Sequence, residues 1–264
     1  MKPFRILLLA AVCAAGFVEP LHAETPQVPA PAAAAGSEAV APAALKILKE
    51  MSDRLAKARS LSFSVRRAFD EPAANGQPLF YIVDSKVSLR RPDQLKVEVL
   101  GDGPRSDFYY DGKEFAVYFP EQGLLAAETA PPHLEEMLEA AFTKAGIYFP
   151  FVDFIVDDPY AAVTEKLTSA FFVGQSKSVG DTTTDIVAIA NPDFQAQLWI
   201  GAKDRLPRLV WINPTNGTAK SRSMIEFSNW LIDAPKLNLA RAPGAAKAGR
   251  IKFEKPGATH AAKR

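Results

Sequence analysis

In much of this chain, apolar residues recur at every second position, in short runs that end at tight-turn signals. Leu95, Val97 and Val99, for example, alternate with Lys96 and Glu98, a period typical of a strand with one buried face. Asn-Gly and Asp-Gly dipeptides, which favour hairpin turns, separate some of the runs. Short strands joined in sequence order by tight turns form an antiparallel meander. The pattern predicts strands at 61–66, 79–89, 95–99, 108–110, 115–119, 171–174, 184–190, 195–200, 209–212, 223–230 and 251–254.

Two segments have a helical period instead. Apolar residues three and four positions apart predict amphipathic helices over 45–58 and 134–145. Two prolines suit the start of the second helix, and Gly146 suits its end. The stretch that follows, Ile147 to Val156, is rich in aromatic residues and too poor in polar ones for an exposed loop.

The amino terminus has the pattern of a secretory signal peptide. Lys2 and Arg5 precede a short apolar run from Ile6 to Val18, and a membrane span needs about 20 apolar residues. We expect cleavage after Ala23, which makes residues 1–23 the signal peptide; the alternative is a retained anchor helix. The single cysteine, Cys13, lies inside the apolar run and is expected to leave with it.

Composition divides the rest of the chain into a folded part and flexible ends. Residues 24–42 and 235–250 are rich in alanine and proline, which predicts an extended linker and a mobile stretch. Residues 259–264 form a basic tail. Between the linker and the tail, residues 43–258 form the predicted folded domain. Dispersed carboxy-terminal cations could contact anionic lipid heads, although a solvated tail is the plainer interpretation.

Charge and hydrophobicity exclude several classes of protein. The chain is 48% hydrophobic, which is too apolar for a disordered chain. Its net charge of +1 gives no reason to expect nucleic acid as a partner. Because no second apolar stretch has the length of a membrane span, we expect a soluble mature protein without a transmembrane segment, and a monomer.

A search for catalytic patterns predicts no enzyme, no metal site and no cofactor. The sequence has neither a His-Glu-x-x-His zinc helix nor a Gly-x-Ser-x-Gly elbow. His133 precedes two glutamates and could ligate a metal, but an exposed histidine at a helix start is the commoner case. Asp153, Asp157 and Asp158 could form a carboxylate pair, or could face water beside Pro159.

The order of these pieces resembles the lipoprotein carrier LolA and its relatives. Leu61–Val65 occupies the place of that family's first strand after the helix. Arg90–Leu95 resembles its Arg-Pro turn, Tyr110–Pro120 resembles its Asp-Gly-Lys hairpin, and Phe253–Ala258 resembles its final strand.

A nearer resemblance is to a family of periplasmic proteins, the domain of unknown function 2092 (DUF2092). Gly146–Asp153 resembles its Gly-Ile-x-x-Pro-x-x-Asp segment. Leu198-Trp199-Ile200, followed by Leu206-Pro207-Arg208, resembles its Trp-Ile and Leu-Pro-Arg signatures. Together these motifs extend over most of residues 45–258.

The resemblance implies an α+β fold of the LolA-like kind: an unclosed, strongly curved antiparallel β-sheet, or half-barrel, with helices packed in its concave face. It implies a periplasmic, non-enzymatic binding protein that holds a lipid, a lipoprotein acyl chain or another hydrophobic small molecule between sheet and helical lid. The alternative is an envelope protein-interaction or sensor module without lipid cargo. Arg91 matches an arginine that latches the lid in the lipoprotein carrier. The residues expected to line the ligand site are Phe80, Ile82, Val97, Val99, Phe108, Tyr110, Phe115, Val117, Met137, Leu138, Phe142, Phe149, Phe151, Phe154 and Ile155.

Overall fold

The computed structural model describes residues 39–215 and 222–253, which contain twelve strands and five helical segments. The strands are β1 (Ser60–Pro72), β2 (Pro78–Arg90), β3 (Gln94–Gly101), β4 (Ser106–Tyr110), β5 (Glu114–Phe119), β6 (Leu124–Thr129), β7 (Ser169–Ser176), β8 (Thr184–Ala190), β9 (Phe194–Gly201), β10 (Pro207–Pro214), β11 (Ser223–Ile232) and β12 (Gly249–Ile251). The helices are α1 (Pro42–Ala56), α2 (Leu134–Ala145) and α3 (Pro159–Val163), with 3₁₀ turns η1 (Val152–Phe154) and η2 (Pro243–Lys247).

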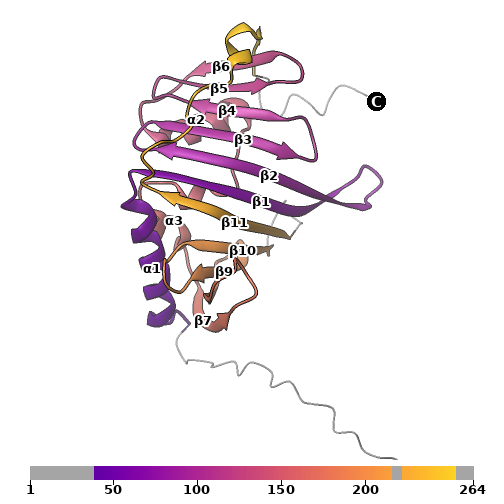
Figure 1. Ribbon diagram of the computed structural model, residues 1–264. Coiled ribbons are helices and arrows are strands. Elements are labelled where there is room, and N and C mark those ends of the chain that lie inside the picture. Colours follow the sequence, from indigo (N-terminus) through magenta and orange to yellow (C-terminus); the bar gives the residue numbers. More distant parts are fainter. Residues whose placement is uncertain (1–38, 216–221, 254–264) are drawn as a thin grey trace, which may run out of the picture. The chain divides into compact units, whose positions relative to one another are not determined.

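All twelve strands belong to one sheet, in the order β12-β6-β5-β4-β3-β2-β1-β11-β10-β9-β8-β7 (Figure 1). The strands from β1 to β6 form one meander and those from β7 to β11 a second, and β11 returns to pair with β1. Neighbouring strands are antiparallel except β12, which is parallel to β6. The two edge strands, β7 and β12, do not pair with each other, so the sheet is unclosed.

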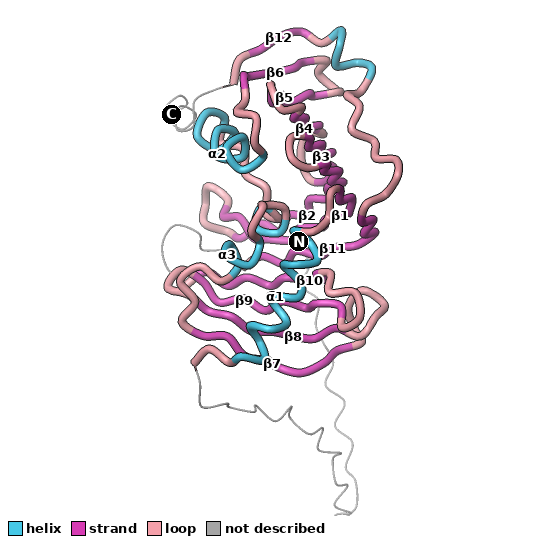
Figure 2. Tube along the Cα trace, turned by 90° about the vertical axis from the view of Figure 1, so that its left-hand side faces the viewer, coloured by secondary structure: helices cyan, strands magenta, loops and turns pink. Residues whose placement is uncertain are grey.

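The sheet curves around α1, α2 and α3, which lie on its concave face (Figure 2). One large core of buried side chains joins these helices to that face of the sheet. A twisted sheet of this length needs its concavity filled, and apolar helix faces fill it here. The predicted fold class, an unclosed curved antiparallel sheet with helices in its concave face, is therefore confirmed.

Helix α1 begins at Pro42, a residue suited to a first helical turn. Its buried residues, Ala44, Leu48, Met51 and Leu55, recur at helical spacing and pack into the core. The helix starts within the linker predicted at 24–42, and the linker's last residues are docked as well. Val40 forms a parallel bridge with Ala170 on β7.

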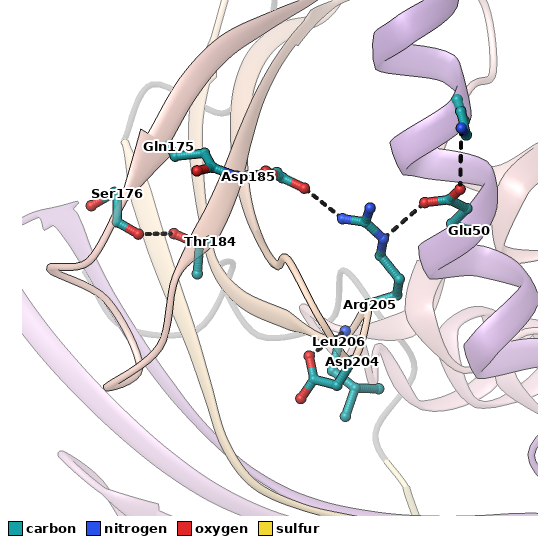
Figure 3. Close-up of polar contacts among 9 residues, drawn as sticks. Glu50, Gln175, Ser176, Thr184, Asp185, Asp204, Arg205 and Leu206 are labelled. Carbon is teal, nitrogen blue, oxygen red and sulfur yellow. Dashed lines mark hydrogen bonds and ion pairs between the residues drawn. The ribbon is translucent and has the colours of Figure 1, made fainter.

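A polar network ties α1 to the second meander (Figure 3). Arg205, in the turn between β9 and β10, forms an ion pair with Glu50 of α1 at 2.8 Å and another with Asp185 of β8. The Asp185 side chain is only 9% exposed and also accepts a hydrogen bond from Gln175 at 2.8 Å. Arg205 thus bridges a buried carboxylate on the sheet and a half-buried one on the helix.

The later part of the stretch 235–250, predicted to be mobile, is packed on the opposite, convex face of β4, β5 and β6. There Ala245 joins a second small core with Tyr109 and Tyr118. The backbone N–H of Ala242 donates to the Tyr109 hydroxyl at 3.0 Å, and burial raises the pKa of Tyr109 to about 12. A Cβ on Gly244 would lie 2.3 Å from the Tyr118 hydroxyl. The small residues that suggested mobility therefore allow close packing instead.

Three predicted segments lie wholly or largely outside the described residues: the signal peptide at 1–23, the linker up to residue 38, and the basic tail at 259–264. In the part of the chain that the structure describes, no helix is long and apolar enough to cross a membrane.

Candidate functional site

A mostly apolar cavity of about 430 Å³ lies between the concave face of β1 to β5 and residues 145–151. Its wall on the sheet side consists of Val65, Arg67, Phe69, Val83, Ser85, Val99, Ser106, Phe108, Val117 and Phe119. Its other wall consists of Ala145, Gly146, Ile147, Tyr148, Phe149, Pro150 and Phe151, with Phe253 from the carboxy-terminal segment.

The register of the sheet explains why its side chains do not fill this space. One row of inward-facing residues runs across β1 to β4 as Val65, Ser85, Val99 and Ser106. Two of these four side chains are serines, which are too small to fill the hollow of a curved sheet. A neighbouring row contains Phe63, Val87, Val97 and Phe108, and its larger side chains belong to the core. The cavity follows the row of small residues.

Aromatic residues from the segment after α2 close the cavity on its inner side. The Phe149 ring lies 5.0 Å from that of Phe108, edge to face. The Phe151 ring lies 5.6 Å from that of Phe63 in the same geometry, and the two inserted rings stack on each other. Such aromatic pairs contribute about 0.5–1.5 kcal/mol each beyond the area they bury. Residues 146–158, which we call the lid segment, are thus anchored on the sheet.

Polar contacts hold both ends of the helical insertion. Arg91, at the end of β2, donates to the Asp157 carboxylate and to the backbone oxygen of Val156, each at 2.9 Å. Its side chain is 13% exposed, and burial lowers the pKa of the guanidinium. Glu135 of α2 accepts from the Asp157 N–H at 2.7 Å. Tyr110 donates to the Pro131 carbonyl at 2.7 Å.

The Arg91 contacts should control local opening of the lid segment. We expect Arg91→Ala to speed amide exchange at residues 156–158 about tenfold or more, because hydrogen bonds from a charged donor are lost. The neighbouring Arg90, which is exposed and bonds only Gln94 within the described residues, provides the control variant Arg90→Ala. Hydrogen exchange read by mass spectrometry checks this, and equal exchange in the two variants would contradict the assignment.

A second, shallower groove lies on the outer side of the insertion, between α2 and α3. Leu138, Phe142, Tyr148 and Val156 contribute to its apolar floor. Phe142 is 58% exposed and Tyr148 is 59% exposed. Tyr148 lines both the groove and the cavity, so it lies where the cavity reaches the surface.

The structure distributes the residues predicted for the ligand site over several places. Five of them line the cavity: Val99, Phe108, Val117, Phe149 and Phe151. Six are buried in the surrounding core without lining it: Val97, Tyr110, Phe115, Met137, Phe154 and Ile155. Leu138 and Phe142 lie in the outer groove. Whether any of these residues binds a ligand stays a prediction.

The placement of Phe80 and Ile82 at the cavity was wrong. They alternate with Val83, which lines the cavity, and so point to the other face of β2. Phe80 is 64% exposed and pairs with Asp70 in the part of the β1–β2 hairpin that extends past β3. The sequence search instead missed cavity residues in the phase facing the core, among them Val83 and Arg67. Arg67 lies two positions after Val65 on β1 and therefore on the same face of the strand. This spacing was the signal that could have identified Arg67 as a cavity residue.

Among the described residues, no group of three or more histidines, cysteines or carboxylates could hold a metal ion. His133 occupies the N-cap position of α2. Asp158 caps α3, where its carboxylate accepts from the Ala161 N–H at 3.0 Å. Asp157 bonds Arg91. Two of the three aspartates that could have formed a catalytic pair, Asp157 and Asp158, therefore have local structural partners.

An unclosed sheet curved around helices, with an apolar cavity between the two layers, defines the half-barrel class of fold that the sequence resemblance implied. The chain belongs to the DUF2092 family of predicted periplasmic proteins, whose model matches residues 44–253. The family's description agrees with the periplasmic location predicted from the sequence.

Solved structures of similar fold are distant in sequence. The complex of MucA and MucB from Pseudomonas aeruginosa is 14% identical over 76% of this chain and 62% of that one, with a TM-score of 0.42. LprF from Mycobacterium bovis is 14% identical over 80% of this chain and 100% of its own, with a TM-score of 0.43. The LolA superfamily protein NE2245 from Nitrosomonas europaea is 11% identical over 71% and 92%, with a TM-score of 0.28.

The chain spans 64% of the length of the chain in the MucB crystal structure. No curated protein is similar enough in sequence to match it. These likenesses are too distant to assign a ligand or a partner.

Proposed function

We propose that this protein is a periplasmic, non-enzymatic carrier or receptor that binds a lipid, an acyl chain or another hydrophobic ligand between its sheet and its lid segment. The observation that supports this proposal is the apolar cavity of about 430 Å³. Well-packed domains contain few voids larger than a water molecule, and the volume falls within the roughly 300–1,000 Å³ typical of ligand pockets. Apolar cavities stay dry and take up apolar molecules.

Filling the cavity should abolish binding. Val99 on β3 points into the cavity, whereas the next residue, Leu100, points to the opposite face of the same strand. We expect Val99→Trp to lower uptake of an added acyl ligand at least tenfold, because the indole occupies the space that the ligand needs. Leu100→Trp adds the same side chain outside the cavity and should bind as the wild type does.

The measurement is native mass spectrometry of the mature protein from periplasm, with solvent extraction and lipid analysis, followed by uptake of added phospholipid and fatty acid. A retained lipid-sized mass that Val99→Trp loses and Leu100→Trp keeps would support the proposal. An unliganded wild-type protein that takes up neither lipid, or equal retention by both variants, would contradict it.

A second candidate function is that of an envelope protein-interaction or sensor module. The observation that favours it is the outer groove, where Phe142 and Tyr148 expose apolar surface, as docking sites do. This function predicts a protein crosslinked to the α2–α3 face in the periplasm, and no lipid on extraction.

A further inference from the structure

Among the described residues that line the cavity, Arg67 is the single charged one. It lies on β1, two positions from Val65, and therefore on the same face of the strand. Its Nε donates to the Ser223 hydroxyl at 3.0 Å, and its guanidinium lies 4.1 Å from the centre of the Phe69 ring. Among the described residues, the two terminal nitrogens of Arg67 have no hydrogen-bond partner.

No carboxylate of the described residues lies within ion-pair distance of Arg67. Glu71, further along β1, acts on it electrostatically but forms no ion pair. Its neighbour Arg66, on the other face of the strand, is paired with Asp84 at 2.8 Å. One face of β1 thus carries a neutralised arginine, and the cavity face carries an arginine without a counter-ion.

A half-buried cation in an apolar wall is costly to keep without a partner. Burial lowers the pKa of Arg67, yet a guanidinium keeps its proton in proteins. Its planar fork matches a carboxylate or a phosphate and can bind either one through two parallel hydrogen bonds. Arg67, which has no ion-pair partner among the described residues, is therefore suited to bind an anionic group of a ligand.

Arg67 supplies the cation of the cavity wall, and Ser85 and Ser106 are the other polar side chains on its sheet side. Val65, Arg67 and Phe69 are successive inward positions of β1, so the Cα atom of Arg67 lies about 7 Å along the strand from that of Val65. The guanidinium of Arg67 lies over the Phe69 ring. Phe108, Phe149 and Phe151 are buried and close the apolar part. Tyr148 is exposed at the opening. The volume is near the lower end of the roughly 300–1,000 Å³ range of ligand pockets, which suits one acyl chain rather than several.

We infer that the ligand is an anionic amphiphile with a single acyl chain, whose carboxylate or phosphate head binds Arg67 while its chain fills the apolar end of the cavity. This inference rests on the proposed function and specifies its ligand class. It separates Arg67, which selects the head, from the apolar residues, which hold the chain.

The test compares three probes that share a long saturated chain: palmitate, hexadecanol and palmitoyl lysophosphatidic acid. Binding to the delipidated mature protein is measured by calorimetry and native mass spectrometry. We expect the wild type to bind the anionic probes about tenfold to a hundredfold more tightly than hexadecanol, the range that charge-assisted hydrogen bonds provide. Palmitate and lysophosphatidic acid, compared with each other, show whether a carboxylate or a phosphate head fits better.

Arg67→Gln should remove that preference, so that palmitate no longer binds more tightly than hexadecanol. Arg66→Gln, which changes the adjacent arginine on the other face, should keep the preference, and Arg67→Lys should keep part of it. Because Arg67 lacks a counter-ion, Arg67→Gln should fold with a melting temperature no lower than that of the wild type. Thermal unfolding of each variant checks this.

The outcomes separate the two proposals. If hexadecanol and palmitate bind the wild type equally, or if Arg67→Gln weakens both equally, the head-group assignment is wrong and the apolar cavity function stands. If none of the three probes binds the wild type, both proposals are overturned.

Discussion

Replacing Arg205 by alanine should lower the free energy of unfolding by about 2–3 kcal/mol, because it leaves a buried carboxylate without its cation. Asp185 is 9% exposed, and without Arg205 it keeps only the hydrogen bond from Gln175. Glu50 on α1 loses its contact with the sheet at the same time. Removing one partner of a buried pair costs up to about 3–5 kcal/mol, and partial exposure of Arg205 and Glu50 brings the expected loss below that range.

The matched control is Lys49→Ala on the same helix. Lys49 pairs with Asp53, and both side chains are about half exposed, so this substitution should cost no more than about 0.5 kcal/mol. Urea unfolding, followed by circular dichroism, measures both variants. Equal losses in the two variants would show that Arg205 contributes no more than a surface ion pair. Arg205→Met, which keeps much of the side-chain volume, should lose nearly as much as Arg205→Ala if the charge is responsible.

Local periodicity predicted most of the sheet but missed β6. The alternation of Val97 and Val99 with polar neighbours reports a strand with one buried face, and both meanders contain such strands. In β6, Leu125 and Ala126 point to opposite faces and both are buried. Leu125 packs against the carboxy-terminal segment. The face of β6 that would otherwise carry polar residues is therefore apolar, and its sequence does not alternate. A strand covered on both sides by distant segments cannot be recognised from alternation.

The error at β2 has a different cause, because the tip of this strand is exposed rather than covered. Residues 79–83 are apolar at every position, because this part of the hairpin extends past β3 and its two faces have similar surroundings. Only Val87 and Leu89, further along the strand, show which phase faces the core. Phe80 and Ile82 are an odd number of positions from Val87 and Leu89, so they lie on the opposite face of β2.

Contacts between distant residues were beyond the reach of sequence patterns. Arg67 bonds Ser223, 156 positions later in the sequence. Arg205 pairs with Glu50, which lies far earlier in the sequence. The residues around Arg205 do not distinguish it from a solvated surface cation, and those around Arg67 indicate only which face of β1 it occupies. Arg91 was identified only because a family resemblance supplied its position. The aromatic residues of the lid segment, by contrast, are close together in the sequence. Their clustering predicted Phe149 and Phe151 at the cavity without knowledge of how the strands pair.

The lid segment should depend on one ring above all. Phe151 is 1% exposed and contacts both Phe63 of β1 and Phe149, so Phe151→Ala removes an aromatic anchor and enlarges an existing void. We expect the free energy of unfolding to fall by about 3–4 kcal/mol, the usual cost of such a truncation. Phe142→Ala, in the same insertion, changes a ring that is 58% exposed, and should cost no more than about 0.5 kcal/mol.

Hydrogen exchange distinguishes how the loss at Phe151 is distributed. Phe151 anchors the lid segment to β1 and lies beside the cavity, so the sheet cannot close around the space left by the missing ring. The lid segment should therefore detach before the strands separate. We expect amides at 149–156 to exchange faster than in the wild type by a larger factor than those of α1, which packs on β7 and β8 with its own apolar face. Uniform acceleration over the domain would instead mean that the lid segment is an inseparable part of the core. If the lid segment cannot open separately, the carrier function would require the ligand to enter through the opening of the cavity at Tyr148.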